Sequence, residues 1–264
     1  MSPKSTGRYV TTTVAGESVK AFVPDPLPPR LSGQQLATLT EPLREAEAAL
    51  GRLDLAGEMI PSLDWFIYAF VRKEALLSSE IEGTQATLVD VLAWEQAEQP
   101  GASNLDDIEE VTNYVAAVNR AFKDIHSPKG PPISVRLLND CHRILMQGVR
   151  GASKKPGEPR RSQNWTGGSR PGNAVFVPPP PEQVADLLSD LERYIHDEDD
   201  LVPLLRIALV HVQFETIHPY LDGNGRLGRM LIALLLDHWQ LLKSPLLYLS
   251  LYLKQNQAAY YRWL

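Results

Sequence analysis

Hydrophobic residues recur at helical spacing along most of the chain from residue 32 onward. Apolar positions three and four residues apart predict amphipathic helices, with polar residues, Gly and Pro between them. The predicted helical segments are 33–50, 62–79, 84–98, 104–126, 134–148, 182–197, 203–217 and 225–242, and a last amphipathic stretch covers 251–264. The sequence therefore predicts an all-α fold class.

The first thirty residues follow a different pattern. Polar and apolar residues alternate over 8–23 around the turn Ala15-Gly16-Glu17, which predicts a short β-hairpin, and a proline-rich lead-in follows over 24–29. We expect residues 1–30 to form a small appendage in front of the helical region 31–100.

A second exception to the helical pattern is the segment 151–181, which is rich in Gly, Pro, Ser and Arg. The apolar run Ala174-Val175-Phe176-Val177 is closed by four prolines, which favours a strand or hairpin over a helix. A stretch of this length without helical periodicity inside a compact domain is more often functional than idle.

Composition and charge narrow the class of protein. The 264 residues hold 26 Lys and Arg against 32 Asp and Glu, so the net charge is -6, and 44% of the chain is hydrophobic. This balance excludes a disordered or collagen-like chain, and it argues against nucleic-acid binding through this portion. The one cysteine, Cys141, lies in a helical run, so we expect a buried thiol in a reducing, cytoplasmic compartment.

No membrane segment is predicted. The longest apolar run, 230–236, is far shorter than a membrane span, and the N-terminus lacks the apolar core of a secretory signal. The C-terminal amphipathic pattern runs to Leu264 without a capping glycine, so we expect the chain to continue beyond this point.

The densest cluster of chemically useful residues lies at 218–229, between two apolar helical segments. Gly223 and Gly225 allow a tight turn with exposed backbone N–H groups, and a helix that begins near Asn224 directs its positive end at the same point. Arg226 and Arg229 are three residues apart on the first turn, where they could bind neighbouring phosphates. The pattern predicts a polyphosphate site.

Two further residues in this segment add chemistry. Asp222 lies beside the predicted polyphosphate site. Its carboxylate suits Mg²⁺, which binds one or two carboxylates together with phosphate oxygens. His218 can take a proton from an incoming hydroxyl as a general base. Together these residues predict phosphoryl or nucleotidyl transfer, and spacing alone does not distinguish the two reactions.

Other interpretations of this segment fit less well. The glycine spacing matches a dinucleotide fingerprint, but a helix rather than a strand precedes it. A calcium loop starting at Asp222 would have Leu227 at its sixth position and Ala233 at its twelfth, where Gly and Glu are needed. A zinc site formed by His211, Glu215 and His218 lacks a further ligand nearby.

With these residues described, the segment resembles the signature of the Fic family, H-P-[FY]-x-[DE]-G-N-G-R-x-x-R, over its whole length. The resemblance implies a Fic fold with a flap hairpin at about 160–180, which would align a target segment through Ala174, Val175, Phe176 and Val177. It also implies AMP transfer from ATP to a Ser, Thr or Tyr hydroxyl of a protein. His218 would then be the base, Asp222 would hold Mg²⁺, and the nucleotide would bind the residues Gly223, Asn224, Gly225, Arg226 and Arg229.

A second motif resembles the inhibitory pattern [ST]-x-x-x-E-[GN] of such proteins, with Ser78, Glu82 and Gly83 at its defined positions. The resemblance implies an inhibitory helix at about 70–83, in which Glu82 pairs with Arg229 and opposes the incoming anionic phosphates. The helix-stop alternative, a solvent-facing glutamate before an ordinary glycine, stays open at this point.

The expected organisation is a Fic N-terminal helical region at 31–100, a core at 101–245 and the start of a C-terminal helical region at 246–264. The expected activity is that of an autoinhibited protein adenylyltransferase that uses ATP and Mg²⁺ on a protein target, which can include the chain itself. Two alternatives are removal of AMP at the same site and a nucleotide-switched binding module with a nucleic-acid-binding domain beyond Leu264. A homodimer is compatible with the sequence.

Other aromatic residues and histidines carry weaker expectations. The run that contains Trp65, Phe66, Tyr68 and Phe70 is expected to pack into the core because its spacing fits a buried helical face. The remaining histidines have no neighbours in the sequence that suggest a chemical role: His126, His142, His196 and His238.

Overall fold

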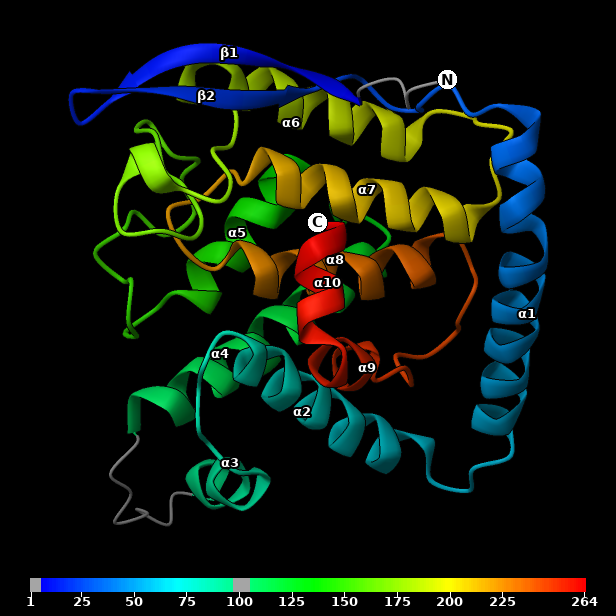
Figure 1. Ribbon diagram of the computed structural model, residues 1–264. Helices are drawn as coiled ribbons and strands as arrows, with labels where there is room; N and C mark the ends of the chain where they lie inside the picture. Colours follow the sequence, from blue (N-terminus) through cyan, green and yellow to red (C-terminus); the bar gives the residue numbers. More distant parts are fainter. Residues whose placement is uncertain (1–5, 97–104) are drawn as a thin grey trace.

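The computed structural model of the chain describes residues 6–96 and 105–264. Helices account for most of these residues, and a two-stranded antiparallel sheet lies near the N-terminus (Figure 1). The predicted all-α class with an N-terminal hairpin is confirmed. The elements in chain order are β1 Gly7–Val14, β2 Glu17–Pro24, α1 Gly33–Glu58, α2 Leu63–Ile81, α3 Leu88–Glu95, α4 Leu105–Ile125, α5 Val135–Leu145, the 3₁₀ turn η1 Pro171–Asn173, α6 Pro181–His196, α7 Pro203–Ile217, α8 Asn224–His238, α9 Leu249–Gln255 and α10 Gln257–Trp263.

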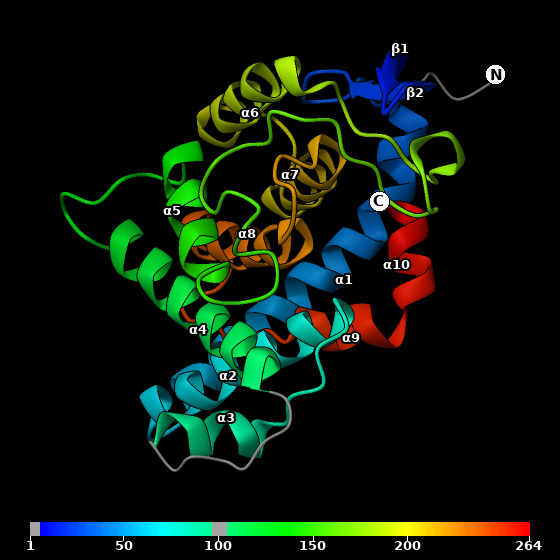
Figure 2. The same ribbon diagram turned by 90° about the vertical axis from the view of Figure 1, so that its left-hand side faces the viewer.

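Helix α8 occupies the centre of the molecule (Figure 2). Its residues Leu227, Met230 and Leu235 are fully inaccessible to solvent, and apolar side chains lie on all its sides. A helix that is hydrophobic all round is stable only when neighbours cover every face. Helices α4, α5 and α7 pack around it and join one hydrophobic core.

Helix α1 is longer than the pattern predicts and stands at the edge of the molecule (Figure 1). It begins at a capping box in which Ser32 accepts from the N–H of Gln35, and it continues through Gly51 to Glu58. Its last turns are held by Lys243, whose N–H donates to Asp54 at 2.9 Å. The prediction stopped at residue 50 because this support comes from a segment distant in sequence.

The C-terminal stretch is broken into two short helices. Asn256 separates α9 from α10 with non-helical φ and ψ of -117° and 31°, and its side chain donates to the carbonyl of Tyr252 at 2.9 Å. Helix α8 also ends earlier than predicted, since Gln240 adopts a positive φ of 57°. Among the described residues, no helix is long and apolar enough to cross a membrane.

The predicted flap hairpin is much less regular than expected. Its β pairing is reduced to one antiparallel bridge between Thr166 and Phe176, and η1 lies between these residues. Proline supplies no N–H to a ladder, so the prolines that bound this segment limit its pairing. The flap instead rests on the N-terminal hairpin, where the N–H of Phe22 donates to the carbonyl of Val177 at 2.9 Å.

The expectation that the aromatic residues at the start of α2 are buried is wrong for three of them. Trp65 is 69% exposed, Tyr68 is 42% exposed and Phe66 is 39% exposed, because this end of the helix extends beyond the core. Cys141, in contrast, is fully buried in α5, as its sequence environment predicts.

Candidate active site

One loop joins α7 to α8 and carries most of the predicted site residues. Helix α7 is capped by His218, which has a left-handed φ of 49° and donates its N–H to the carbonyl of Phe214 at 3.0 Å. Helix α8 has Gly223 as its N-cap, with a φ of 76° that a residue without Cβ adopts at little cost. The loop therefore turns sharply and presents the N-terminal end of α8 to the site.

Asn224 holds the loop in this shape. Its side-chain oxygen accepts from the N–H of Tyr220 at 2.9 Å, and its side-chain nitrogen donates to the carbonyl of the same residue at 2.9 Å. Both side-chain groups are thus used within the loop, so any contribution of Asn224 to anion binding comes through its backbone.

Arg160 fixes the backbone at His218. The Arg160 Nε donates to the carbonyl of His218 at 2.9 Å, and its backbone N–H donates to the carbonyl of Pro219 at 2.8 Å. Burial, together with the nearby Arg160 charge, lowers the pKa of His218 to about 4. The imidazole is therefore neutral at pH 7 and able to accept a proton.

The carboxylate of Glu82 lies on the start of α8. A Cβ added to Gly225 would stand 2.4 Å from Glu82 Oε1, so the carboxylate approaches the helix backbone as closely as a glycine permits. The N-terminal end of a helix stabilises an anion, and here the anion is a side chain of the protein itself.

Arg229 joins α8 to the end of α2. Its Nη2 is 2.7 Å from Glu82 Oε1, its Nε donates to Ser78 Oγ at 2.8 Å, and Nη2 also donates to the Ser78 carbonyl at 2.9 Å. Burial opposes the charge of this guanidinium, but the Glu82 carboxylate outweighs it and raises the pKa of Arg229. Glu82 and Arg229 thus stand as the inhibitory motif implies, and Gly83 follows with a positive φ of 98°.

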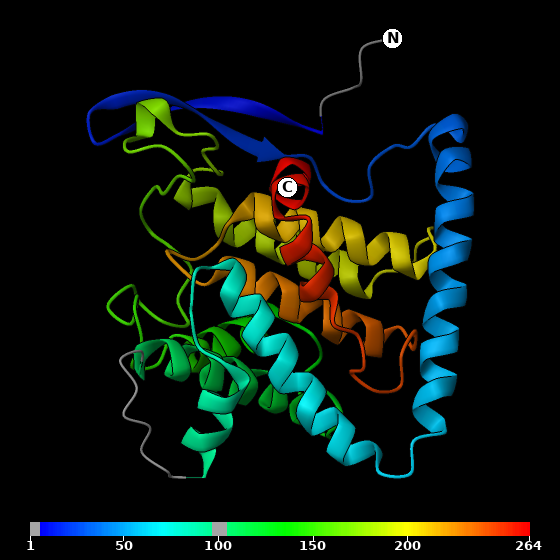
Figure 3. The ribbon, with the colours of Figure 1, turned by 60° about the horizontal axis from the view of Figure 1, so that its bottom comes forward.

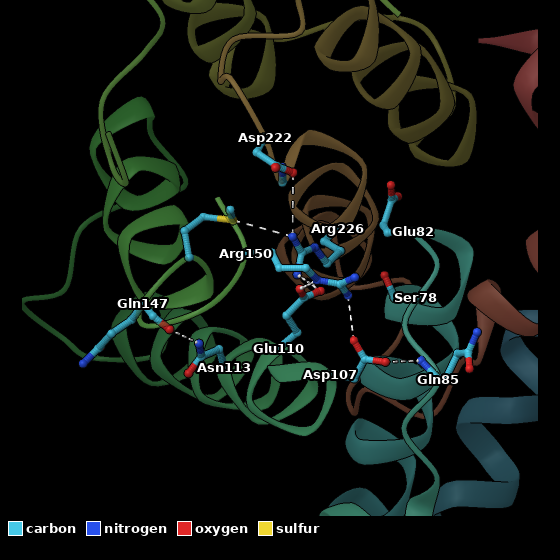
Figure 4. Close-up of polar contacts among 12 residues, drawn as sticks. Ser78, Glu82, Gln85, Asp107, Glu110, Asn113, Gln147, Arg150, Asp222 and Arg226 are labelled. Atoms are coloured by element: carbon cyan, nitrogen blue, oxygen red, sulfur yellow. Dashed lines mark hydrogen bonds and ion pairs between the residues drawn. The ribbon is translucent and has the colours of Figure 1, made fainter. Parts of the chain in front are cut away.

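Arg226, three residues earlier, faces a different carboxylate. Its Nη1 is 3.0 Å from Oε2 of Glu110 on α4, and both side chains are almost fully buried. Glu110 is shared with Arg150, whose Nε donates to the other oxygen at 2.9 Å (Figure 4). The two arginines that sequence spacing assigns to neighbouring phosphates are therefore each paired with a separate glutamate.

Asp222 meets the demands of a Mg²⁺ ligand in part. Its side chain is 36% exposed, one oxygen accepts from the N–H of Gly223 at 2.8 Å, and the other lies 3.1 Å from the Nζ of Lys154. No group of three or more His, Cys, Asp or Glu that could hold a metal occurs within residues 6–96 and 105–264. A single carboxylate beside an anion cradle fits Mg²⁺ that takes its other ligands from phosphates and water.

The zinc alternative does not fit the structure. His211 is engaged through both ring nitrogens, at 3.2 Å from the carbonyl of Gly228 and at 3.0 Å from the hydroxyl of Tyr260. Glu215 is buried against Gly228, and burial raises the pKa of its carboxyl to about 7. These groups pack under α8 and leave no open metal position.

His142 is a site residue that the sequence did not reveal. Its ring stacks on that of Tyr220 with centroids 3.9 Å apart, and its Nδ1 accepts from the N–H of Gly157 at 2.8 Å. The Nε2 therefore carries the proton and donates to the carbonyl of Asp222 at 3.0 Å. Burial lowers its pKa to about 4, so this neutral form persists. Only the pairing of α5 with the distant loop shows this role.

The four flap residues 174–177 differ in exposure. Val175 is 86% exposed, whereas Val177 is buried against the N-terminal hairpin, in a cluster with Val14 and Val19. Asn164 links the flap region to the loop between α7 and α8, since its side chain donates to the carbonyl of Tyr220 at 3.1 Å. The hairpin support for the flap was not predicted from the sequence.

The sequence matches two models of one family. The model described as Fic/DOC family N-terminal covers residues 40–123, and the model described as Fic/DOC family covers residues 132–236. Together these matches span well over half of the chain and include both the α2 motif and the loop 218–229.

A curated relative and two solved structures agree with the family. Protein adenylyltransferase Fic of Drosophila erecta is 35% identical over 128 residues, which is 47% of this chain and 24% of that protein. A Fic family protein from Desulfovibrio desulfuricans has a TM-score of 0.66 and 25% identity, covering 89% of this chain and 67% of that chain. A Fic-1 structure from C. elegans, at 21% identity and a TM-score of 0.62, covers 78% of this chain and 60% of that chain and shares the fold.

The match to the Drosophila relative thus spans about a quarter of that protein's length. The signature at 218–229, the arrangement of α7 and α8 around it and the two family matches lead to one conclusion. This chain belongs to the Fic/DOC family.

Proposed function

We propose that this chain is an autoinhibited protein adenylyltransferase, which transfers AMP from ATP to a Ser, Thr or Tyr hydroxyl of a protein and releases pyrophosphate. The observation that carries this proposal is the ion pair between Glu82 and Arg229, the last residue of a complete Fic signature. The name of the Drosophila relative supports AMP as the transferred group.

The chemistry follows from the positions of two residues. Neutral His218 removes the proton from the target hydroxyl, whose oxygen then attacks the α-phosphorus of ATP. The bond from the α-phosphorus to the bridging oxygen breaks, and pyrophosphate leaves with the electron pair. Asp222 would hold Mg²⁺, which neutralises charge on the leaving phosphates.

The restraint is electrostatic and steric. The Glu82 carboxylate lies on the helix N-terminus at Gly225, where a phosphate oxygen of ATP would bind, and it engages Arg229. A phosphate placed there would meet a like charge and an arginine that already has a partner. Removing the carboxylate therefore frees both the helix end and the guanidinium.

A second activity of the same site is favoured by the position of Glu82. Its side chain is 34% exposed, so the carboxylate can hold a water molecule beside the N-terminal end of α8. That water would attack the phosphorus of a modified target, the bond from phosphorus to the target oxygen would break, and AMP would be released with a proton returned to the hydroxyl. This is the reverse modification, de-adenylylation.

The deciding experiment compares wild type, Glu82→Gly and Glu82→Gly/His218→Ala. Each protein is incubated with Mg²⁺ and ATP labelled on the α-phosphate, and modification is read by intact mass and peptide mapping. We expect one or more AMP units on the Glu82→Gly protein or an added target, and none when His218 is also replaced.

Two outcomes would count against the proposal. Label that appears equally without His218 would assign the base to another group. Absence of AMP gain in every variant, with ATP still bound, would favour de-adenylylation, another nucleotide donor or a binding role.

A further inference from the structure

The two C-terminal helices lie outside both family matches, which end at residue 236. Helix α9 packs along α2, the helix that ends at Glu82, and α10 contacts the end of α2 through Gln257 and Tyr261 (Figure 3). Their contacts with α2 and with α8 decide how firmly Glu82 is held.

The first set of contacts caps the end of α2. The last carbonyl groups of a helix have no partner within the helix and need one elsewhere. The carbonyl of Ile81, the residue before Glu82, accepts from Gln257 Nε2 at 3.1 Å and from the hydroxyl of Tyr261 at 3.3 Å. The carbonyl of Ser78 is taken by Arg229. Helix α10 and the active-site arginine therefore cap the same helix end.

The second set of contacts holds the middle of α2. The N–H of Ser250 donates to the carboxylate of Glu74 at 3.1 Å, its hydroxyl donates to the same carboxylate, and Ser250 is completely buried. Lys254 pairs with Glu80 at 2.5 Å in the last turn of α2, one residue before the helix ends at Ile81. Buried hydrogen bonds of this kind are costly to break without replacement.

The third set of contacts ties α10 to the core. Tyr260 is 8% exposed, and its hydroxyl lies 3.0 Å from Nε2 of His211 on α7. The other ring nitrogen of His211 contacts the carbonyl of Gly228 in α8. Helix α10 thus bridges the inhibitory helix and the helix that carries Arg229.

We propose that α9 and α10 form a latch that holds α2, and with it Glu82, against Arg229. This inference rests on the proposed function, because it assigns the regulation of the same site. A single ion pair with one partner one-third exposed is a weak restraint by itself. The position of Glu82 therefore depends on the helix that carries it, and the C-terminal helices hold the last turn of that helix. Displacing 249–263 from α2 releases the site.

The test removes the two side-chain donors to Ile81 while keeping the bulk of the side chains. The latch variant is Gln257→Leu/Tyr261→Phe, and Tyr261→Phe alone serves as a milder form. The matched control is Tyr252→Phe, since this exposed residue lies on α9 and its hydroxyl has no hydrogen bond within the described parts of the chain. Hydrogen exchange of the α2 amides and AMP transfer are measured, each with Glu82 present and in the Glu82→Gly background.

We expect the amides of residues 77–83 to exchange about tenfold faster in the latch variant, with little change in α4 or α7. Transfer should rise about fivefold when Glu82 is present, and it should not rise further in the Glu82→Gly background. Tyr252→Phe should match wild type in both measurements.

Unchanged exchange at 77–83 in both latch variants would overturn the latch, and so would an equal gain of transfer in the Glu82→Gly background. If Glu82→Gly transfers no AMP, the proposed function fails. The exchange measurement then still decides whether α9 and α10 hold α2, so the two failures are distinguishable.

Discussion

Arg226 and Arg229 are one helical turn apart on α8, and both are buried, yet their partners differ in kind. Glu110, the partner of Arg226, lies in the second turn of α4 and is only 5% exposed. Glu82, the partner of Arg229, follows the last turn of α2 and is 34% exposed. One pair is enclosed by the core, and the other sits at a helix end beside solvent.

The difference separates a permanent contact from a releasable one. Separating Arg226 from Glu110 would leave the buried Arg226 guanidinium with Asp222, 4.0 Å away, as its nearest carboxylate, which is costly. Glu82 can leave Arg229 and be hydrated, because α2 ends there and Gly83 already turns the chain away. We expect the Arg226 pair to determine stability and the Arg229 pair to determine activity.

The largest expected effect is a loss of stability when the buried pair of Arg226 and Glu110 is broken. Glu110→Gln removes the charge that both Arg226 and Arg150 share, so it should lower the free energy of unfolding by about 3 kcal/mol. Glu82→Gln should cost less than about 1 kcal/mol. Chemical denaturation of the purified variants measures both values.

The matched control for that comparison is Glu109→Gln, since Glu109 neighbours Glu110 on α4 and forms no ion pair within the described residues. Equal losses for Glu110→Gln and Glu82→Gln would remove the distinction between the two pairs.

The next effect is a gain of activity when Glu82 is removed from Arg229. Glu82→Gly should raise AMP transfer at least about tenfold, because it frees Arg229 and the start of α8 together. Glu82→Gln, which removes the charge but keeps the bulk, should give a smaller increase. Initial rates with labelled ATP decide the order, and a rate at or below wild type for both would contradict the inhibitory role.

A smaller effect is expected from the serine that shares Arg229 with Glu82. Ser78→Ala leaves the buried Nε of Arg229 without its 2.8 Å acceptor, which loosens α2 from α8 and should raise transfer about threefold. Ser79→Ala is the control, because the buried hydroxyl of Ser79 has no hydrogen-bond partner in the described structure. Equal rates for the two variants would show that Ser78 adds nothing to the restraint.

The smallest effect is expected from pH. His218 has a pKa lowered from 6.5 to about 4 by burial, so it is neutral at every pH well above that value. Titration of this base therefore should not change transfer between pH 6 and 8, and transfer should fall only as pH approaches 4. A rate–pH profile of the Glu82→Gly protein with an inflection near 6.5 assigned to His218 would contradict this environment.

Several features were predictable from the sequence because they depend on local spacing. The helical periods gave α7 with its observed bounds, and the alternation around Gly16 gave the N-terminal hairpin. The signature 218–229 identified the loop, since its residues act through neighbours in the chain. The Glu82 to Arg229 contact was expected from a motif resemblance rather than from spacing.

Other features depend on distant segments and could not be predicted in this way. His142 and Glu110 reach the site from α5 and α4, and neither has a sequence neighbour that suggests a role. The flap is irregular because its support comes from β2 rather than from its own pairing. The contacts of Gln257 with the end of α2 join residues far apart in sequence.

The sequence by itself determined which elements form and which residues carry chemistry, because helical periodicity, turns and a contiguous motif are properties of neighbours along the chain. A motif resemblance anticipated the pairing of Glu82 with Arg229, and only the tertiary structure decided the other pairings and every distance. Burial and the geometry of packed helices assign Glu110 to Arg226, Glu82 to Arg229 and α10 to the end of α2, and no local pattern encodes these distances.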